Sequence, residues 1–360
     1  MAINNGGNLT RGANCGPLGC DGKSIVCEAL RVKILILGAG GMVGRKLAAQ
    51  LAVKGKIGGH AITHLTMHDV VAAAPPAAPF AVVSLASDFS NTGAAESLIS
   101  NRPDLIVVLA SIVSGEAEQD FEKGYRINLD GTRLLLEAIR VAGNDYRPRL
   151  VFSSSIAVFG APFPEVITDD YFTTPLTSYG TQKAICELLI SDYTRRGFVD
   201  GVSLRFPTLV VRPGLPNKAA SSFFSNIIRE PLAGKSAVLP VGLDVRHWVA
   251  SPRAAIEFII HAASMDLAAI GPRRSLNMPG LCVSVGGMLE ALRDVAGQKA
   301  VDLIHHEPDE FIQTIVAGWP VNFDAARAIE LGFAGDVDFA SIIRTHIDDE
   351  LGGQLFYALS

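Results

Sequence analysis

A tyrosine, a lysine and a serine near the middle of the chain could act together on an alcohol. Tyr179 and Lys183 are four residues apart in a stretch with a helical pattern, so they share a helix face. A free tyrosine, with a pKa of about 10, is a poor base at neutral pH, but a neighbouring ammonium favours the phenolate. Ser155 follows an expected strand and could hydrogen-bond the reacting oxygen. These residues predict proton removal from a hydroxyl; a solvent-facing pair and backbone-capping serines are the alternatives.

A glycine-rich turn provides a second candidate site, here for an anion. An apolar run at residues 32–37 leads into a helical pattern at residues 42–54. The turn and the start of this helix contain Gly38, Gly40, Gly41, Met42, Val43 and Gly44. Residues without Cβ let the backbone approach a pyrophosphate, and a helix start offers N–H groups and a positive dipole end. The turn therefore predicts dinucleotide binding, with a tight turn that binds nothing as the alternative.

Asp69, at the end of the next expected strand, indicates which dinucleotide is bound. A carboxylate there can accept hydrogen bonds from the ribose hydroxyls and would repel a 2′-phosphate, which favours NAD over NADP. Arg45 and His68 are nearby cations that weaken this inference, and an ordinary strand-end aspartate is the alternative. Asp88, after the following strand, is a candidate contact to the adenine or a turn-forming residue.

The elements that must position these residues alternate between strands and helices. Strands are expected at residues 32–37, 65–69, 81–85, 104–109, 149–154 and 202–208, and helices at 42–54, 121–142 and 179–196. This alternation predicts an α/β fold with a doubly wound parallel Rossmann sheet and a smaller C-terminal substrate-binding lobe.

The expected domain boundaries follow from the same pattern. Residues 31–208 are expected to form the NAD-binding Rossmann domain, after a disordered or extraneous extension at residues 1–30. Residues 209–360 should form mainly the substrate lobe, with segments at about 245–280 returning to the Rossmann domain. Helices are expected to start at Ser251-Pro252 and at Ser284.

Composition excludes several other classes of function. The chain is 49% hydrophobic and 19% charged, with a net charge of −5, which does not favour nucleic acid as a partner. The best candidate membrane span, residues 70–86, contains three prolines, and no secretory signal opens the chain, so a cytoplasmic protein is expected. Five cysteines, three of them Cys15, Cys20 and Cys27, suggest free thiols, and no spacing predicts a metal site.

Three motifs together resemble the extended short-chain dehydrogenase/reductase family: the glycine turn, VFSSSIAVFG at residues 151–160 and SYGTQK at residues 178–183. The resemblance implies that Ser155, Tyr179 and Lys183 form a catalytic triad, that Lys183 also binds the nicotinamide ribose, and that the protein is a homodimer. It further implies cofactor contacts or proximity for Leu109, Ala110, Ser111, Asn128 and Pro207. Leu37 and Phe159 replace the threonine and tyrosine usual in the family.

Further stretches, among them residues 114–132, 212–234 and 246–255, resemble a branch of this family that oxidises a four-carbon sugar acid. That likeness implies NAD-dependent oxidation at C2 to 2-oxo-tetronate. Ser111, Ser114, Ser155 and Tyr179 are then candidates to contact the substrate hydroxyls, and Asn217, Lys218 and Arg246 to bind its carboxylate. Lys218 could instead be a solvated loop charge, and Arg246 could only brace the two lobes.

Three other interpretations remain open from the sequence. A nucleotide-sugar epimerase or dehydratase would use the same glycine turn and triad but would not accumulate NADH. An NAD-sensing regulator could share the fold, although it would be free to lose the tyrosine or lysine. A different hydroxy acid could also be the substrate, because pocket geometry decides between close isomers.

Overall fold

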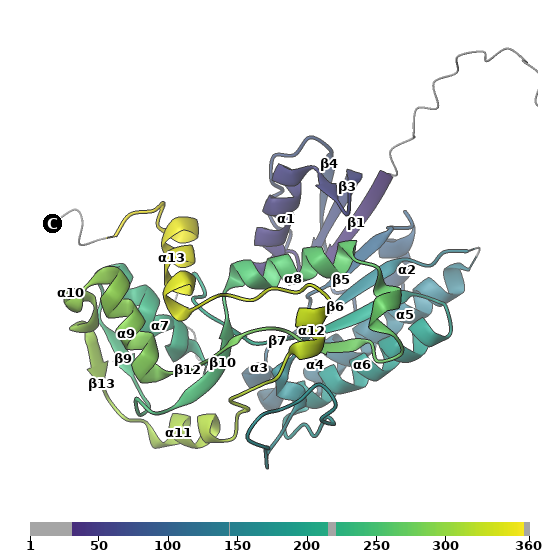
Figure 1. Ribbon diagram of the computed structural model, residues 1–360. Coiled ribbons are helices and arrows are strands. Elements are labelled where there is room, and N and C mark those ends of the chain that lie inside the picture. Colours follow the sequence, from purple (N-terminus) through teal and green to yellow (C-terminus); the bar gives the residue numbers. More distant parts are fainter. Residues whose placement is uncertain (1–30, 144, 215–220, 356–360) are drawn as a thin grey trace, which may run out of the picture.

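The computed structural model describes residues 31–143, 145–214 and 221–355 of the chain. Figure 1 shows two lobes, a larger one built on a sheet and a smaller one that holds most of the C-terminal helices. The extension expected at residues 1–30, with Cys15, Cys20 and Cys27, lies outside the described residues.

A mainly parallel, eight-stranded sheet forms the centre of the larger lobe, in the order β11-β7-β6-β5-β1-β3-β2, with β4 also paired to β3. The strands are β1 (Arg31–Leu37), β2 (Lys56–Ile57), β3 (His60–Asp69), β4 (Ala81–Ala86), β5 (Leu105–Val108), β6 (Arg149–Ser155), β7 (Asp200–Phe206) and β11 (Ser275–Asn277). Among the described pairings of this large sheet, only β2–β3 is antiparallel. Because β1 lies between β3 and β5, the strand order reverses beside it, which confirms the predicted doubly wound α/β sheet.

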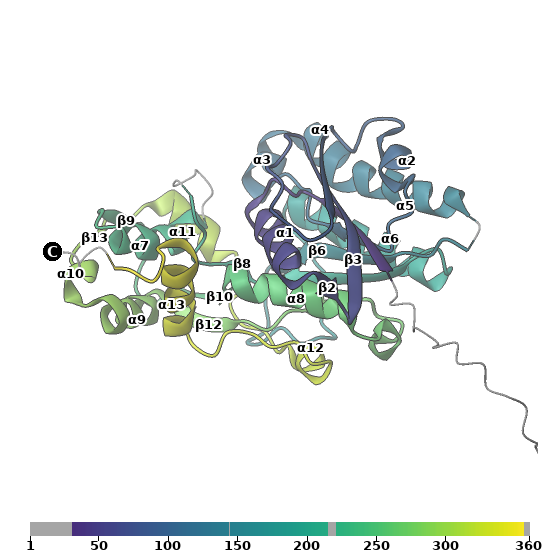
Figure 2. The same cartoon turned by 90° about the horizontal axis from the view of Figure 1, so that it is seen from above.

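Alternate residues of β1 point into two hydrophobic cores on opposite faces of the sheet. Ile34 and Ile36 belong to one core, and Leu35 and Leu37 to the other; all four are at most 1% exposed. The helices α1 (Met42–Lys54) and α8 (Pro252–Ser264) cover the first face, and α2 (Ala94–Ile99), α5 (Gly131–Ala142) and α6 (Ser178–Arg195) cover the second (Figure 2). Burial on both faces explains why this strand is an unbroken apolar run.

The smaller lobe has two sheets and a core of its own. Its strands are β8 (Thr208–Leu209), β9 (Ala237–Leu239), β10 (Arg246–Ala250), β12 (Leu281–Ser284) and β13 (Ile304–His306), and its helices α7 (Ser222–Leu232), α9 (Val285–Ala296), α10 (Gln298–Val301), α11 (Glu310–Ala317) and α13 (Phe339–Glu350). Three elements from the same half of the chain belong to the larger lobe instead. Helix α8 covers the large sheet, β11 pairs with β7, and α12 (Ala326–Glu330) packs beside β11.

The capping serines fulfil their predicted roles, whereas one expected strand is divided. Ser251 accepts a hydrogen bond from the Ala254 N–H and Ser284 from the Gly287 N–H, each at 3.0 Å, so both cap helices. The strand expected at residues 202–208 ends at Phe206, because Pro207 has no N–H to donate. Thr208–Leu209 pairs instead with β10, so the chain leaves the large sheet for the small one at this proline.

The long helix expected at residues 121–142 is also more complex. It consists of α4 (Phe121–Gly124), a π-helical stretch at Tyr125–Asp130 and α5, and the short helix α3 (Ser114–Gln119) precedes it. A π-helical stretch changes which side chains face inward and is frequent near functional sites. Here it includes the buried Asn128, which is 2% exposed.

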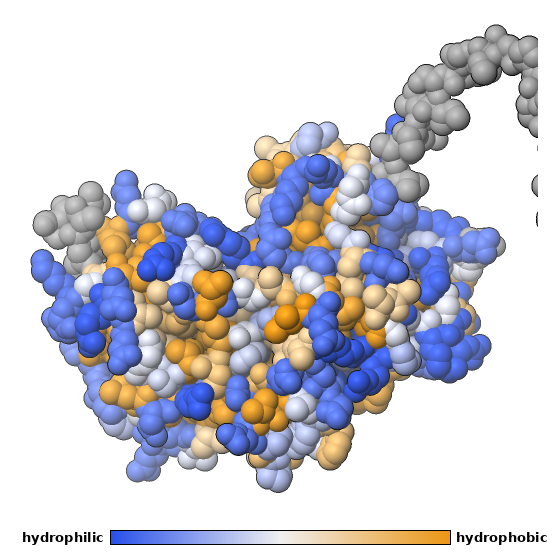
Figure 3. Space-filling model, viewed as in Figure 1, coloured by the Kyte–Doolittle hydropathy of each residue, from blue (hydrophilic) through white to orange (hydrophobic). Residues whose placement is uncertain are grey.

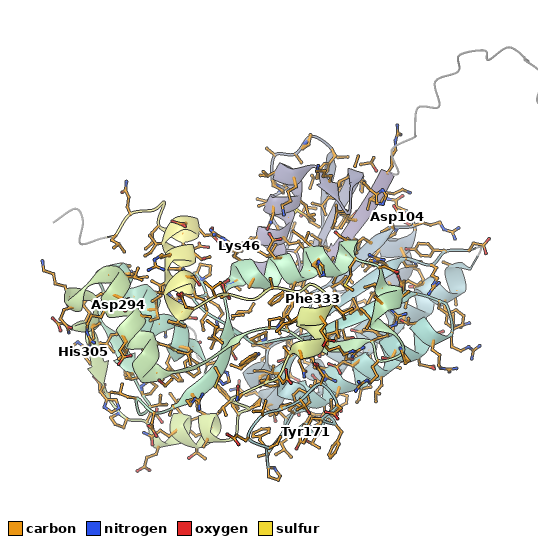
Figure 4. The ribbon with its side chains drawn as sticks, in the orientation of Figure 1. Lys46, Asp104, Tyr171, Asp294, His305 and Phe333 are labelled. Atoms are coloured by element: carbon orange, nitrogen blue, oxygen red, sulfur yellow. The ribbon has the colours of Figure 1, made fainter. Side chains whose placement is uncertain are left out.

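Ion pairs connect the C-terminal helix α13 to the larger lobe. Lys46 on α1 (Figure 4) pairs with Asp349, at 3.6 Å, and with Glu350. Arg253 on α8 donates to the Asp349 carboxylate at 2.5 Å. Because these side chains are partly exposed, each pair contributes at most about 1 kcal/mol to the stability of the fold. Together the pairs mainly hold α13 in place against α1 and α8.

The surface in Figure 3 mixes hydrophilic and apolar residues over both lobes. Within the described ranges, no helix combines the length and apolar character that a membrane crossing requires. Cys186 and Cys282 are free thiols, and the described residues contain no group of three or more His, Cys, Asp or Glu side chains placed to hold a metal ion.

Candidate active site between the two lobes

The turn between β1 and α1 passes so close to neighbouring backbone that side chains do not fit. Gly38 has a φ of +86°, and a Cβ on it would lie 2.5 Å from the Ala110 nitrogen. A Cβ on Gly44 would lie 2.3 Å from the Gly38 carbonyl oxygen. Gly38 and Gly44 are therefore required by the contact of β1 with α1 and with the chain after β5.

The start of α1 is suited to an anion. Gly41 is its N-cap, no side chain caps the helix, and its first turn contains no acidic residue. The N–H groups of this turn and the positive end of the helix dipole are thus available to a ligand. Met42 and Val43, the first two residues of α1, are partly exposed, so the start of the helix is accessible and its chemistry fits a pyrophosphate.

Asp69 ends β3 directly beside this turn. One of its carboxylate oxygens accepts a hydrogen bond from the Gly40 N–H at 2.8 Å, and the other from the Val70 N–H at 2.7 Å. A Cβ on Gly40 would lie 3.0 Å from the Asp69 carboxylate, so this glycine makes the contact possible. Burial lowers the pKa of His68, so this side chain is neutral at pH 7. The sequence suggested that a positive charge on His68 would weaken the preference for NAD, and a neutral His68 does not have that effect.

Asp88 faces Arg126, a partner that the sequence did not indicate. The Arg126 guanidinium donates to the Asp88 carboxylate at 2.6 Å, and Ser90 donates to its other oxygen at 2.5 Å. Burial raises the pKa of Asp88, but the hydrogen bonds from Arg126 and Ser90 outweigh it, and the net pKa is lowered. Asp88 is thus an ionised carboxylate near the end of β4.

The chain bends sharply after β5, where Leu109, Ala110 and Ser111 were expected to pass under a cofactor. The N–H groups of Leu109 and Ala110 both donate to the Leu37 carbonyl, at 2.8 and 2.9 Å. Asn128 then fixes the next residue, because its Oδ1 accepts from the Ile112 N–H at 2.9 Å. Its Nδ2 donates to Gln182 Oε1 at 2.7 Å, so Asn128 joins this bend to α6 and has a positioning geometry.

The structure brings the serine, tyrosine and lysine of the expected triad together. Thr177 caps α6 by accepting from the Gly180 N–H at 3.0 Å, which places Tyr179 in the first turn of the helix. The Lys183 ammonium lies 5.5 Å from the centre of the Tyr179 ring and donates to the Ser153 carbonyl at 2.8 Å. Ser111 and Ser155 hydrogen-bond with Tyr179.

Burial acts on both titratable groups of this cluster. It raises the pKa of Tyr179 to about 12, although the hydrogen bonds with Ser111 and Ser155 lower it in part. Burial lowers the pKa of Lys183 to about 8, with Cys186 and Glu187 acting in the opposite direction. At neutral pH the cluster therefore holds a neutral phenol beside an ammonium, and a further positive charge at the site would favour the phenolate.

Of the three residues expected to contact a substrate carboxylate, the structure describes only Arg246. Arg246 is exposed at the start of β10 and lines a pocket of about 450 Å³ in the smaller lobe, together with Asp244, His306 and Gln313. Asn217 and Lys218 lie outside the described residues.

Two other expected site residues lie on neighbouring segments. Pro207, expected beside the cofactor, is buried at the step from β7 to β8, and Ser114, expected to contact a substrate hydroxyl, is exposed as the first residue of α3.

Sequence reasoning missed several polar residues behind the triad, namely Ser154, Gln182, Glu187 and Arg205, which are all buried. Two signals were available in the sequence. Glu187 lies four residues after Lys183 and so on the same face of α6. Arg205 is the only charged residue between Gly201 and Phe206, in an otherwise buried strand.

A family model described as the NAD dependent epimerase/dehydratase family matches residues 34–264. Two relatives, both named D-erythronate dehydrogenase, cover most of the chain. The protein from Cupriavidus necator is 44% identical over 323 residues, which are 88% of this chain and 98% of the relative. The protein from Haemophilus influenzae is 41% identical over 320 residues, 89% of this chain and all of the relative.

Solved structures include one of high identity. The structure titled nucleoside-diphosphate-sugar epimerase from Agrobacterium tumefaciens is 55% identical, with a TM-score of 0.89, and covers 95% of this chain and 99% of its own. The holo form of a GalE-like L-threonine dehydrogenase from Cupriavidus necator has a TM-score of 0.75 at 22% identity, and covers 88% of this chain and 99% of its own. The second likeness supports the fold alone.

Proposed function

This chain belongs to the NAD-dependent epimerase/dehydratase family and is an NAD-dependent dehydrogenase, and we propose that it oxidises D-erythronate at C2 to 2-oxo-tetronate. The substrate is proposed from the two relatives named D-erythronate dehydrogenase, which match this chain over nearly their whole length. The observation that carries the chemistry is the juxtaposition of Ser155, Tyr179 and Lys183, at the same edge of the parallel sheet as the glycine turn.

The described residues fit NAD, since Gly38, Gly40 and Gly41 leave the backbone of the turn open to a ligand and no side chain caps the helix start. We assign the pyrophosphate to the first turn of α1, the adenosine ribose to Asp69, the adenine side to Asp88 and the nicotinamide ribose to Lys183. Leu109, Ala110 and Ser111 would lie under the cofactor, and Pro207 beside the nicotinamide amide. When bound, NAD supplies the acceptor for the hydride that leaves C2.

Tyr179 is the proposed general base for the C2 hydroxyl. Its phenolate would take the hydroxyl proton while the C2–H bond breaks and the C2=O bond forms. Ser155 would donate a hydrogen bond to the reacting oxygen and keep it beside the tyrosine, with Ser111 and Ser114 as further contacts to hydroxyl groups. The Lys183 ammonium would stabilise the phenolate, which it can do only while it carries its proton.

Arg246 is the proposed anchor for the substrate carboxylate. Replacing it with Ala should raise KM for the sugar acid roughly 10- to 100-fold, because a hydrogen bond to a charged group contributes about 1.5–3 kcal/mol. The NAD Kd should change much less, since Arg246 lies in the smaller lobe. Steady-state kinetics and calorimetric NAD titration measure these two quantities.

The matched control for this substitution is Arg293→Ala. Arg293 is an exposed arginine on α9 that donates to Gln298 at 2.8 Å and does not line the Arg246 pocket. The Arg293→Ala variant should leave KM for the sugar acid unchanged. If KM is also unchanged in Arg246→Ala, Arg246 does not bind the substrate and only braces the two lobes.

The proposed function is tested by following NADH formation at 340 nm. Purified protein would be given D-erythronate, L-threonate or D-glycerate, each with NAD and with NADP. We expect the highest kcat/KM for D-erythronate with NAD, since the Asp69 carboxylate would repel the 2′-phosphate of NADP. Equal or faster oxidation of either other acid would contradict the substrate assignment.

A nucleotide-sugar epimerase or dehydratase is the second candidate, and the 55% identity with the Agrobacterium structure described as a nucleoside-diphosphate-sugar epimerase favours it. Such an enzyme returns the hydride that it removes, so no net NADH would form. Bound NAD, no NADH from any sugar acid and conversion of a nucleotide sugar would together favour this alternative.

A further inference from the structure

A buried ion pair lies directly behind the proposed catalytic group. Arg205 on β7 donates to both carboxylate oxygens of Glu187 on α6, with Nε to Oε1 at 2.9 Å and Nη2 to Oε2 at 2.7 Å. Their side chains are only 10% and 4% exposed. Removing two charges from water is costly, and apolar residues often stabilise a fold equally well, so stability alone is a weak reason for this pair.

The pair is hydrogen-bonded to the strand that carries Ser155. Ser154 donates to the Glu187 Oε1 at 2.5 Å. Ser154 lies between Ser155 and Ser153, whose carbonyl accepts the hydrogen bond from the Lys183 ammonium. Glu187 therefore holds the same end of β6 that presents both the serine hydroxyl and the lysine acceptor.

Arg205 extends the network across the sheet. Its Nη1 donates to Asn277 Oδ1 on β11 at 3.3 Å, and its guanidinium packs 4.9 Å from the centre of the Phe159 ring. The ends of β6, β7 and β11 and the face of α6 are thereby joined through two side chains. Such a rigid, fully hydrogen-bonded support is what a precisely positioned site requires.

Glu187 also lies one helical turn after Lys183. The groups that surround the Lys183 ammonium are the Phe152 ring and Ser153 carbonyl from β6, and Tyr179, Cys186 and Glu187 from α6. Of these, Glu187 is the carboxylate, and its charge raises the pKa of Lys183 against the effect of burial.

Resting on the proposed function, we propose that Glu187 and Arg205 are positioning residues for the reaction. The pair fixes Ser155 and Lys183 relative to Tyr179, and the Glu187 carboxylate helps to keep Lys183 protonated. Neither side chain contacts the substrate; both act through the residues that do.

Glu187→Gln tests this proposal, because it keeps the size of the side chain and removes its charge. We expect kcat for D-erythronate to fall roughly 10- to 100-fold, as misplacement of a site by about 1 Å can cost. KM and the NAD Kd should change by less than about threefold. The rate should also decline at a lower pH than in wild type, since Lys183 then loses its proton more easily.

Asp200→Asn is the matched control. Asp200 pairs with Arg149 at 3.5 Å across the same two strands, β7 and β6, but at their opposite ends. It should leave kcat and the pH profile unchanged. If Glu187→Gln does not fold, as judged by thermal unfolding, Ser154→Ala removes only the serine hydrogen bond and should lower kcat with KM unchanged.

A direct titration of Lys183 separates this proposal from the proposed function. In protein labelled with [ε-¹³C]lysine, NMR follows the Lys183 signal, assigned with Lys183→Met. The midpoint should be near pH 8 in wild type, lower in Glu187→Gln and unchanged in Asp200→Asn. A lowered midpoint in a protein that makes no NADH supports the positioning pair and overturns the proposed function. An unchanged midpoint and an unchanged kcat in Glu187→Gln overturn the positioning pair.

Discussion

Replacing Tyr179 with Phe should lower kcat for sugar-acid oxidation roughly 10³-fold and leave NAD affinity nearly unchanged. General acid–base catalysis contributes about 10²- to 10⁴-fold in enzymes, and the phenol oxygen is the atom that Ser111 and Ser155 hydrogen-bond. The ring itself remains in the variant, so its packing against Lys183 is kept. Stopped-flow measurement of NADH at saturating substrate and NAD gives this ratio.

Tyr146→Phe is the control for loss of a phenol hydroxyl. The Tyr146 hydroxyl donates to the Pro103 carbonyl at 2.9 Å, in the connection that leads to β6, away from the triad. This variant should oxidise the substrate at the wild-type rate. A Tyr179→Phe enzyme that retains more than about a tenth of the wild-type kcat would show that another group accepts the proton.

Replacing Gly44 with Ala should weaken NAD binding at least roughly 100-fold. The new methyl group would lie 2.3 Å from the Gly38 carbonyl oxygen, so α1 would have to move away from β1. The first-turn N–H groups would then leave the anion. Loss of two hydrogen bonds to a charged group, each about 1.5–3 kcal/mol, corresponds to that factor or more. Isothermal titration with NAD measures the change in Kd.

Gly318→Ala provides the comparison in the smaller lobe. Gly318 follows α11 with a φ of −87°, and a Cβ there would lie 3.5 Å from the Ile315 carbonyl, an ordinary contact. Its NAD Kd should equal that of wild type. Thermal unfolding of both variants separates loss of the fold from loss of the binding turn, and wild-type NAD affinity in a folded Gly44→Ala protein would contradict the assigned pyrophosphate site.

The parts of this site that follow local rules could be predicted from the sequence. The glycine spacing between a buried strand and a helix indicated the turn, and the four-residue spacing of Tyr179 and Lys183 indicated a shared helix face. Parallel strands end at one edge of a sheet, which placed Ser155 near them. Each of these inferences needs only a periodicity and one rule of topology.

The remaining features depend on contacts between distant segments. The π-helical stretch that includes Asn128, and the contact of Asn128 with Gln182, follow from packing between α5 and α6 and have no signature in a helical pattern. The Glu187–Arg205 pair joins two elements whose register the sequence does not specify. Pro207 had a visible signal, because a proline cannot donate within a sheet, yet the expected strand continued through it.

The most direct test of the account follows the hydrogen at C2. D-Erythronate carrying deuterium at C2 would be oxidised with NAD, and the NADH analysed by mass spectrometry. The account predicts that the deuterium appears in NADH and that 2-oxo-tetronate forms in equal amount. Unlabelled NADH would assign the oxidation to another carbon, and an absence of NADH from a protein that binds NAD would contradict the dehydrogenase reaction itself.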